Sequence, residues 1–375
     1  MAADGTNADG PRESIAAGRP PAGVTAAVAT MMRRGGVPGL SMAVVNRERT
    51  LLAAGYGLAN RTANTPAMAS TSYLWFSMSK IVTATAALRL VDEGRLDLKA
   101  PVSEYVGYLQ VPGTTPSVGQ LLNHTAGFGN PMPVRWVHPA DADPPDPGAL
   151  LRRLMSRRSA YRYPAGQSAR YSNVGYLAAG EVIAAAAGVP FEAYVRQSVL
   201  RPSGMEHTGF RYEDGADKAT GYVKAPRIAG PLLGGLLPGG IAGDRHGPYV
   251  SLHPFYVDGP AYGGLVGDVL DARRFLRLHL RDGEIDGVRV LSAHTARRMR
   301  SIDQAGKPFD HGTGWFRRPT MAAGDWVEHY GAGAGFWNVM RLYPDRGLGV
   351  VVMSNSTRMY DFEPLFALLA SASWP

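Results

Sequence analysis

The sequence of 375 residues contains no cysteine. This absence excludes a disulfide scaffold, a zinc or iron–sulfur site held by thiolates, and catalysis by a thiol nucleophile. Charged residues are also scarce, since they make up 19% of the chain against about 25% in a typical soluble protein. Glycine and proline are abundant, with 46 and 28 residues. This composition predicts a compact, loop-rich globular protein.

Lysine is rare among the basic residues. Only five of the 39 are lysines, namely Lys80, Lys99, Lys218, Lys224 and Lys307. The formal net charge of +8 is compatible with an acidic partner such as nucleic acid or a membrane surface. However, the arginines fall in scattered pairs with acidic residues between them, and no nucleic-acid-binding motif accompanies them. We therefore expect a solvated basic surface, with no nucleic-acid and no membrane partner.

Long apolar runs and cofactor motifs are missing as well. No stretch of 18 apolar residues occurs, and the N-terminal 23 residues lack the pattern of a signal peptide, so we expect a cytoplasmic protein. No HExxH, P-loop or EF-hand pattern is present, and the nine histidines show no metal-ligand spacing. We expect neither a metal nor a cofactor.

The secondary-structure signals at both ends of the chain differ from those in its middle. Apolar runs predict strands at 39–47, 50–58, 326–333, 336–344 and 347–355. Helical patterns cover 22–34, 77–93, 148–158, 174–199, 271–283 and the C-terminus. We predict an α/β (α+β) fold in which one antiparallel sheet, flanked by helices, is built from N- and C-terminal segments. Within this single unit, residues 20–98 and 263–375 form the mixed α/β part, and residues 99–262 form an inserted, mainly helical part with substrate-wall loops.

The helix predicted at 77–93 carries the first candidate for chemistry. Lys80 is the only formal charge between Phe76 and Leu88, in a segment otherwise made of apolar and small residues. Burial disfavours the ammonium form, so such a lysine can serve as a base. Ser77 lies three residues earlier and therefore on the same helix face. This Ser-x-x-Lys spacing is a weak signal by itself, and context has to support it.

Two further short motifs supply that context. Tyr171-Ser172-Asn173 precedes a predicted helix; a tyrosine can act as general base or acid when cationic neighbours lower its pKa, and the Asn173 amide can hold a lysine or a substrate carbonyl. His329-Tyr330-Gly331, followed by Ala332, lies on a predicted strand, and a strand edge there can direct a backbone N–H at an oxyanion.

Taken together, the three motifs resemble the serine β-lactamase-like superfamily, in particular the class C β-lactamases, the family VIII carboxylesterases and the DD-peptidase group. The resemblance extends to LLNHTAGF (121–128), LRPSGMEHTGF (200–210) and GGLVGDVLDARRFL (263–276), and covers about residues 20 to 370. It implies an acyl-enzyme on Ser77, with Lys80 and Tyr171 as the proton-shuttling base. Asn173 would orient the substrate or Lys80, and the N–H groups of Ser77 and Ala332 would form the oxyanion hole.

One departure from the family pattern bears on specificity. The lactamases usually carry Lys-Thr-Gly where this chain has His329-Tyr330-Gly331. A partly neutral histidine should weaken carboxylate recognition, and we expect Tyr330 to narrow that edge of the cleft. We further expect His124 to be structural, Asp271 to cap the helix that it opens, and Trp136 with the PLLGGLLPGGIAG segment (231–243) to form the wall of an acyl pocket or else an ordinary flexible connection.

The functional prediction is a serine hydrolase, with a carboxylesterase for small esters as the first hypothesis. Alternatives that use the same chemistry are a transacylase of small-molecule biosynthesis, a D-amino-acid peptidase and a weak β-lactamase. A penicillin-binding-like module without catalysis is the alternative of another class. A small ester or amide is the expected binding partner, and the sequence leaves the oligomeric state open.

Overall fold

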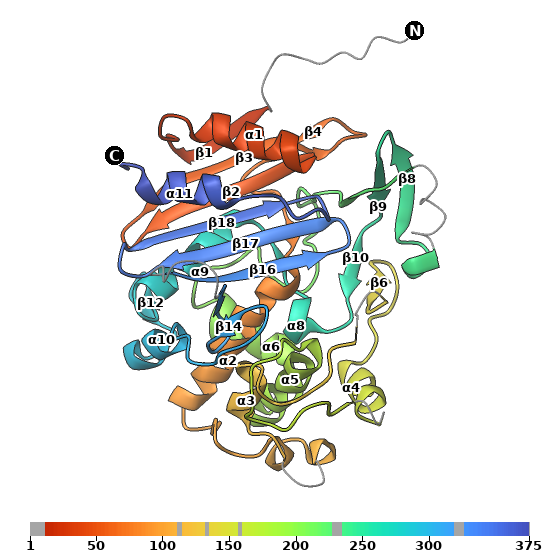
Figure 1. The fold of residues 1–375 in the computed structure, drawn as a ribbon, viewed down its shortest axis with the longest axis vertical. Coiled ribbons are helices and arrows are strands. Elements are labelled where there is room, and N and C mark those ends of the chain that lie inside the picture. Colours follow the sequence, from red (N-terminus) through yellow and green to blue (C-terminus); the bar gives the residue numbers. More distant parts are fainter. Residues whose placement is uncertain are drawn as a thin grey trace.

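The computed structural model describes residues 12–110, 115–131, 135–156, 160–226, 235–318 and 326–374. Within these residues the main sheet has nine strands, and its neighbours all pair antiparallel (Figure 1). Its order is β1 (Glu13–Gly18), β3 (Thr50–Asn60), β2 (Gly39–Asn46), β18 (Leu348–Ser354), β17 (Phe336–Tyr343), β16 (Val327–Gly333), β15 (Phe316–Arg317) and β14 (Asp310–His311), with β4 (Thr65–Pro66) on β3. The sheet therefore joins the two ends of the chain.

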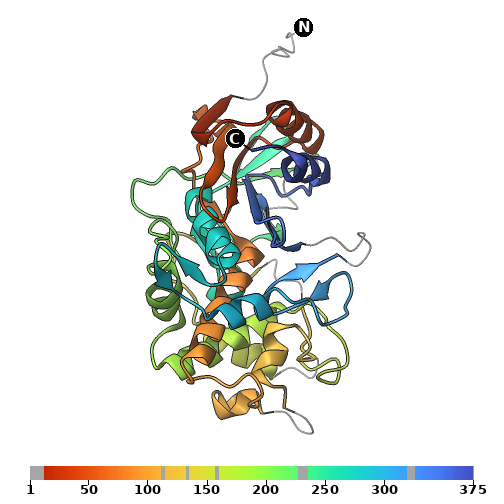
Figure 2. The same ribbon diagram turned by 90° about the vertical axis from the view of Figure 1, so that its left-hand side faces the viewer.

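Helices cover both faces of this sheet. Helices α1 (Val24–Gly35) and α11 (Glu363–Ser371) lie on one face, and α9 (Val269–Leu280) packs on β2 and β18 from the other (Figure 2). Strand β2 is consequently buried almost throughout. Its alternate residues enter two separate cores, with Val44 facing α1 and α11 and Val45 facing α9.

The other half of the molecule is mostly helical. Helix α2 (Ser79–Asp92) runs through its centre and packs against α5 (Asn173–Ala187) and α8 (Pro260–Gly263). Around them lie α3 (Val118–Leu122), α4 (Pro147–Met155), α6 (Phe191–Val195), the π-helical turn η4 (Arg196–Leu200), α10 (Ala293–Met299), and the 3₁₀ turns η1 (Phe76–Met78), η2 (Val102–Glu104) and η3 (Gly107–Leu109). Because α2 is surrounded on all sides, eleven of its residues are buried, among them Lys80.

Among the described residues, four small sheets lie outside the main sheet. They are β5 (Tyr73–Leu74) with β11 (Val266–Gly267), β6 (Val137–Pro139) with β10 (Phe255–Val257), β12 (Glu284–Ile285) with β13 (Val288–Arg289), and β8 (Ala242–His246) and β7 (Tyr222–Lys224) on either side of β9 (Tyr249–Leu252). The inserted middle part thus contains strands as well as helices. Short strands of this kind give weak sequence signals because they hold too few residues for an alternating pattern.

The predicted fold class is confirmed, including the hairpin of β2 and β3 and the three C-terminal strands. The prediction that Asp271 caps its helix is wrong. The side chain of Asp268 caps α9 by accepting the N–H of Asp271, and the Asp271 carboxylate accepts hydrogen bonds from the His207 N–H and the Thr208 hydroxyl.

Length and apolar composition determine whether a helix of the described residues can span a membrane. No single helix there is long and apolar enough to cross a membrane. The bent pair Asn173–Ala187 and Phe191–Leu200, broken by 75°, passes on length and composition alone.

A buried ionic cluster ties α11 to the main sheet. The Arg341 guanidinium on β17 lies 2.5 Å from the Glu328 carboxylate of β16 and 2.7 Å from that of Glu363 on α11. The Glu328 side chain is fully buried, and that of Arg341 is 2% exposed. The Tyr330 hydroxyl donates to the same Glu328 carboxylate at 2.5 Å. These contacts attach strand β16 to β17 and α11 on the face of the sheet that α11 covers.

We predict that Glu328→Gln lowers the free energy of unfolding by about 3 kcal/mol, because removing one partner leaves a buried Arg341 charge incompletely paired. Urea unfolding followed by circular dichroism measures the change. Glu284→Gln, which breaks the more exposed ion pair with Arg289, serves as the control and should cost less than about 1 kcal/mol. Equal losses in the two variants would contradict this account of the cluster.

Candidate active site

Ser77 lies in the 3₁₀ turn η1, directly before α2. The residue in front of it, Phe76, has a φ of 46°, a left-handed conformation that costs a non-glycine residue about 1–3 kcal/mol. The Phe76 ring is 8% exposed and lies within 6.5 Å of the Phe255 and Phe336 rings, between centroids. This strained turn presents Ser77 at the wall of a cavity.

Lys80 is fully buried one turn later, and its Nζ makes three contacts. It lies 3.1 Å from Ser77 Oγ, 2.8 Å from Asn173 Oδ1 and 2.8 Å from the Tyr262 carbonyl oxygen. Burial lowers the pKa of Lys80 well below its ordinary value, which favours the neutral amine. A neutral amine has two N–H donors and one lone pair. The two oxygens of Asn173 and Tyr262 can only accept, so the lone pair is left for the Ser77 hydroxyl proton.

Tyr171 and Asn173 lie at the start of α5, where Ser172 is the N-cap and its hydroxyl accepts the Gly175 N–H. The Tyr171 hydroxyl is close enough to Ser77 for the serine side chain to influence its pKa. The expected lowering of its pKa by cations is wrong for this structure, because burial raises the pKa of Tyr171 and the nearby Ser77 side chain offsets this only in part. Tyr171 is therefore a neutral phenol here.

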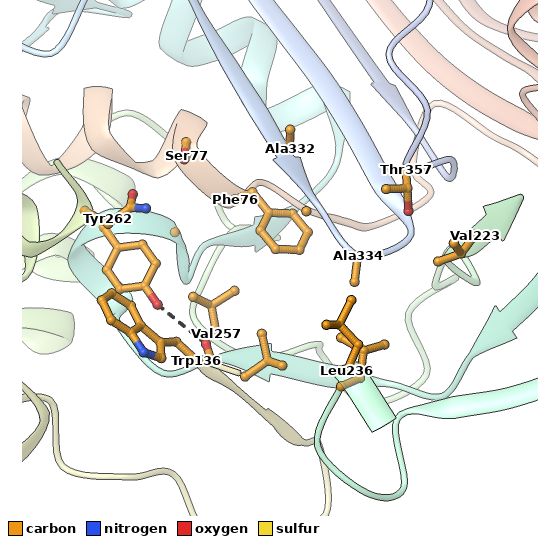
Figure 3. A pocket seen from close by; sticks show the side chains of 15 residues that line it. Phe76, Ser77, Trp136, Val223, Leu236, Val257, Tyr262, Ala332, Ala334 and Thr357 are labelled. Atoms are coloured by element: carbon orange, nitrogen blue, oxygen red, sulfur yellow. Dashed lines mark hydrogen bonds between the residues drawn. The ribbon is translucent and has the colours of Figure 1, made fainter. Parts of the chain in front are cut away.

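Strand β16 passes close to the Ser77 turn, and two glycines make this possible. A Cβ on Gly331 would stand 1.9 Å from the Trp75 carbonyl oxygen, and a Cβ on Gly333 would stand 2.0 Å from the Phe76 ring. Ala332 between them lines the same cavity as Ser77 (Figure 3). The backbone approach at this point thus requires glycine at 331 and 333.

The side chains of His329 and Tyr330 point to opposite faces of β16. Tyr330 packs on Trp337 and Phe362 in the core below α11. The expectation that Tyr330 narrows the cleft is therefore wrong, because alternate residues of a strand face opposite sides. His329 is 1% exposed, and burial together with nearby Lys80 lowers its pKa well below the ordinary value. It is a neutral imidazole and provides no cation for a carboxylate.

His124 packs against the Tyr171 ring and hydrogen bonds with the backbone on either side of it. Its Nδ1 accepts the Ser172 N–H at 3.1 Å, its carbonyl accepts the Arg170 N–H at 2.8 Å, and its ring lies 4.6 Å from that of Tyr171, between centroids. The structure thus gives His124 the structural position that the sequence predicted.

The cavity beside Ser77 has a volume of about 350 Å³. Aromatic walls come from Phe76, Trp136 and Tyr262, and aliphatic walls from Val223 and Leu236, among others (Figure 3). None of the described residues that line it carries a formal charge. Trp136 and part of the 231–243 segment therefore do form a wall, whereas residues 231–234 lie outside the described residues.

A comparison with models of protein families identifies the family of the chain. A model described as Beta-lactamase matches residues 24–372, nearly the whole chain. The chain belongs to the beta-lactamase family. This confirms the superfamily that the motifs predicted.

The curated proteins to which the chain is similar share at most 28% of its residues over the aligned regions given below. The chain is 28% identical over 241 residues to the putative penicillin-binding protein PbpX of Bacillus subtilis (strain 168), covering 63% of this chain and 59% of that protein. Protein flp of Staphylococcus aureus (strain COL) is 24% identical over 333 residues, covering 88% and 62%. The chain thus spans about three fifths of the length of these two relatives. A beta-lactamase of Pseudomonas fluorescens is 25% identical over 352 residues, covering 88% and 92%.

Solved structures of the family share the fold. The octameric penicillin-binding protein homologue from Pyrococcus abyssi superposes with a TM-score of 0.76 at 23% identity, covering 92% of this chain and 76% of that one. The D-amino acid amidase from Ochrobactrum anthropi SV3 gives 0.73 at 23% identity, covering 91% and 92%. EstCE1, a hydrolase with promiscuous acyltransferase activity, gives 0.71 at 21%, covering 92% and 96%.

Two residues of this beta-lactamase-family site, Tyr262 and His311, were not predicted from the sequence. The Tyr262 carbonyl holds Lys80, and the Tyr262 ring lines the cavity beside Trp136. Its position directly before the Gly263-Gly264 segment was the available signal. His311 on β14 lies 6.2 Å from Tyr171, between ring centroids. No local pattern distinguishes it, because only the folded sheet brings β14 next to Tyr171.

We predict that Gly331→Ala pushes β16 away from η1, because the new Cβ would overlap the Trp75 carbonyl oxygen. Activity against any substrate that acylates Ser77 should fall by about 10²-fold or more if the Ala332 N–H is displaced. Gly107→Ala is the matched control, since no atom lies within 4 Å of its Cβ position, and it should keep full activity. A folded Gly331→Ala protein with normal activity would refute the tight approach of β16.

Proposed function

We propose that this protein is a serine esterase that forms an acyl-enzyme on Ser77 and prefers small esters with an apolar acyl or alcohol part. One observation carries the proposal: Lys80 Nζ, whose other two hydrogen-bond partners can only accept, lies 3.1 Å from Ser77 Oγ, at the wall of a mostly apolar cavity with no charged residue in its described lining. Cavities of this size and lining suit small apolar ligands with a few polar anchors.

In the proposed mechanism, Ser77 Oγ attacks the ester carbonyl carbon while Lys80 takes its proton. The N–H groups of Ser77 and Ala332 bind the oxyanion, and Asn173 keeps the Lys80 amine oriented. The bond between the carbonyl carbon and the alcohol oxygen then breaks, and the alcohol departs with one proton, which the proton that Lys80 accepted from Ser77 replaces in the site. Water next attacks the acyl-enzyme and gives a proton to Lys80, and Ser77 leaves as a hydroxyl after taking that proton back. His329 and Gly331 shape the strand that carries Ala332.

Charged substrates fit this site less well. A free carboxylate or ammonium would lose hydration in a cavity whose described lining has no opposite charge. This argues against penicillins and D-amino-acid peptides as the main substrates. A module without catalysis is disfavoured because it has no use for a buried lysine beside a serine.

Acyl transfer to an alcohol or amine is a second candidate. The apolar lining holds few groups that would bind water, so an apolar acceptor can compete for the acyl-enzyme. The fold shared with EstCE1, described as a hydrolase with promiscuous acyltransferase activity, supports testing it. Product ratios measured with added alcohols or amines separate transfer from hydrolysis.

We predict that p-nitrophenyl butyrate acylates the protein, and that p-nitrophenyl hemisuccinate reacts at least about tenfold more slowly, because its carboxylate must be desolvated. Intact-mass spectrometry should locate the acyl group on Ser77. Ser77→Ala should lose at least about 10³-fold in kcat/KM, whereas Ser156→Ala, an exposed serine, keeps full activity. The absence of an adduct with every ester tested would overturn the proposal.

The activity should rise with pH through the pKa of Lys80, since only the neutral amine accepts the Ser77 proton. Burial lowers this pKa, so the rise must be complete well below the ordinary lysine value. Lys80→Arg should cost about 10²-fold or more at every pH, because a guanidinium keeps its proton. A pH–rate profile of kcat/KM for both proteins tests this; an unchanged profile in Lys80→Arg would exclude Lys80 as the base.

A further inference from the structure

The Tyr171 ring is surrounded by three buried histidines from three separate elements. His124 follows α3, His311 lies on β14 and His329 on β16, with ring centroids 4.6, 6.2 and 6.2 Å from that of Tyr171. The rings of His124 and His311 are 4.7 Å apart. All three side chains are at most 4% exposed. We call these three residues the imidazole cage.

The cage contains polar atoms that the fold leaves unpaired. His329 Nδ1 lies 2.7 Å from the Tyr330 carbonyl oxygen, which can only accept, so its proton is on Nδ1 and its Nε2 is a bare lone pair. Among the described residues, Nε2 of His329 and Nε2 of His311 have no hydrogen-bond partner although both are buried. Unpaired buried nitrogens destabilise a fold, and an apolar ring at 311 would avoid one of them. Their position beside the Tyr171 ring suggests a use in the reaction.

The cage is polar but uncharged. Burial lowers the pKa of His124 and His329 well below the ordinary value and that of His311 to about 4. The other titratable groups around it are Lys80 from α2, Tyr176 from α5, and Asp310 beside His311, whose carboxylate accepts the Gly306 N–H. Arg170, next to Tyr171 in the chain, is exposed and stacks on the Tyr163 ring. A cationic cage would favour the phenolate form of Tyr171, whereas a neutral one keeps the phenol.

We propose that His311 is a positioning residue that, with His124 and His329, adapts Tyr171 to give its phenolic proton to the departing alcohol. The inference rests on the proposed esterase function and names its substrate class: esters of unactivated alcohols. In this step the bond between the carbonyl carbon and the alcohol oxygen breaks, and that oxygen takes the Tyr171 proton. The transient Tyr171 phenolate then receives the proton that Lys80 took from Ser77. The dipoles of neutral His124 and His311 stabilise this phenolate better than apolar rings would, whereas His329, whose only ring proton is held by the Tyr330 carbonyl, contributes by packing.

The test is His311→Phe, which keeps a flat ring and removes the unpaired nitrogen. A leaving p-nitrophenolate needs no proton, but a leaving alkoxide does. We therefore expect kcat for an alkyl butyrate to fall by about tenfold, and kcat for p-nitrophenyl butyrate to stay within about threefold. The melting temperature should stay the same or rise, because an unpaired buried polar atom is gone. A purely structural role for His311 predicts no difference between the two esters.

Two further variants complete the experiment. Tyr171→Phe should show the same selective loss on the alkyl ester, and adding His311→Phe to it should cause no further loss, since both changes act on one proton transfer. His279→Phe is the matched control: His279 is another buried histidine with an unpaired nitrogen, but it packs against Phe275 and Trp315. It should leave the ratio of the two rates unchanged.

The outcomes separate this inference from the proposed function. If His311→Phe slows both esters equally or neither, or if its effect adds fully to that of Tyr171→Phe, the role of His311 is refuted while the esterase activity stands. If the unmodified protein forms no acyl-enzyme with either ester, the proposed function itself has failed.

Discussion

The site depends on one buried amine. Lys80 is fully buried in the centre of the molecule and is held by two oxygens that can only accept hydrogen bonds. Burial makes the neutral form the stable one, and the two acceptors use up its N–H groups. The direction of its lone pair, and with it the basicity offered to Ser77, follows from the packing of α2 against α5 and α8.

The elements around Lys80 are arranged to keep charge away from the reacting atoms. The glycines of β16 allow its backbone to approach the Ser77 turn, while Glu328 and Tyr330 on the same strand join an ionic cluster on the far face of the sheet. The near face carries neutral His329, and the cavity beyond Ser77 has no charged residue in its described lining. Strand alternation thus separates the ions that hold the fold from the neutral groups of the site.

Much of the site could be predicted from the sequence, because several of its residues lie only a few positions apart in the chain. Ser77 and Lys80 meet because residues three apart share a helix face, and the position of Asn173 follows from the cap of α5. The sheet was predictable for a similar reason, since β2, β3, β17 and β18 are long, mostly apolar strands and β16 directly precedes its partner β17 in the chain. The short strands of the middle part, the orientation of Tyr330 and the cap of α9 were not, because each depends on a neighbour that is remote in sequence or on a register that one residue shifts.

The sequence by itself determined the sheet from both chain ends, the serine–lysine pair and the family motifs, since periodicity and short spacing encode them. Only the tertiary structure decided the charge states. The pKa of Tyr171 rises and those of the three cage histidines fall because of burial among residues from distant elements. The tertiary structure also decided that the described lining of the cavity carries no charge and that His311 stands beside Tyr171, because desolvation and proximity exist only once the chain has folded.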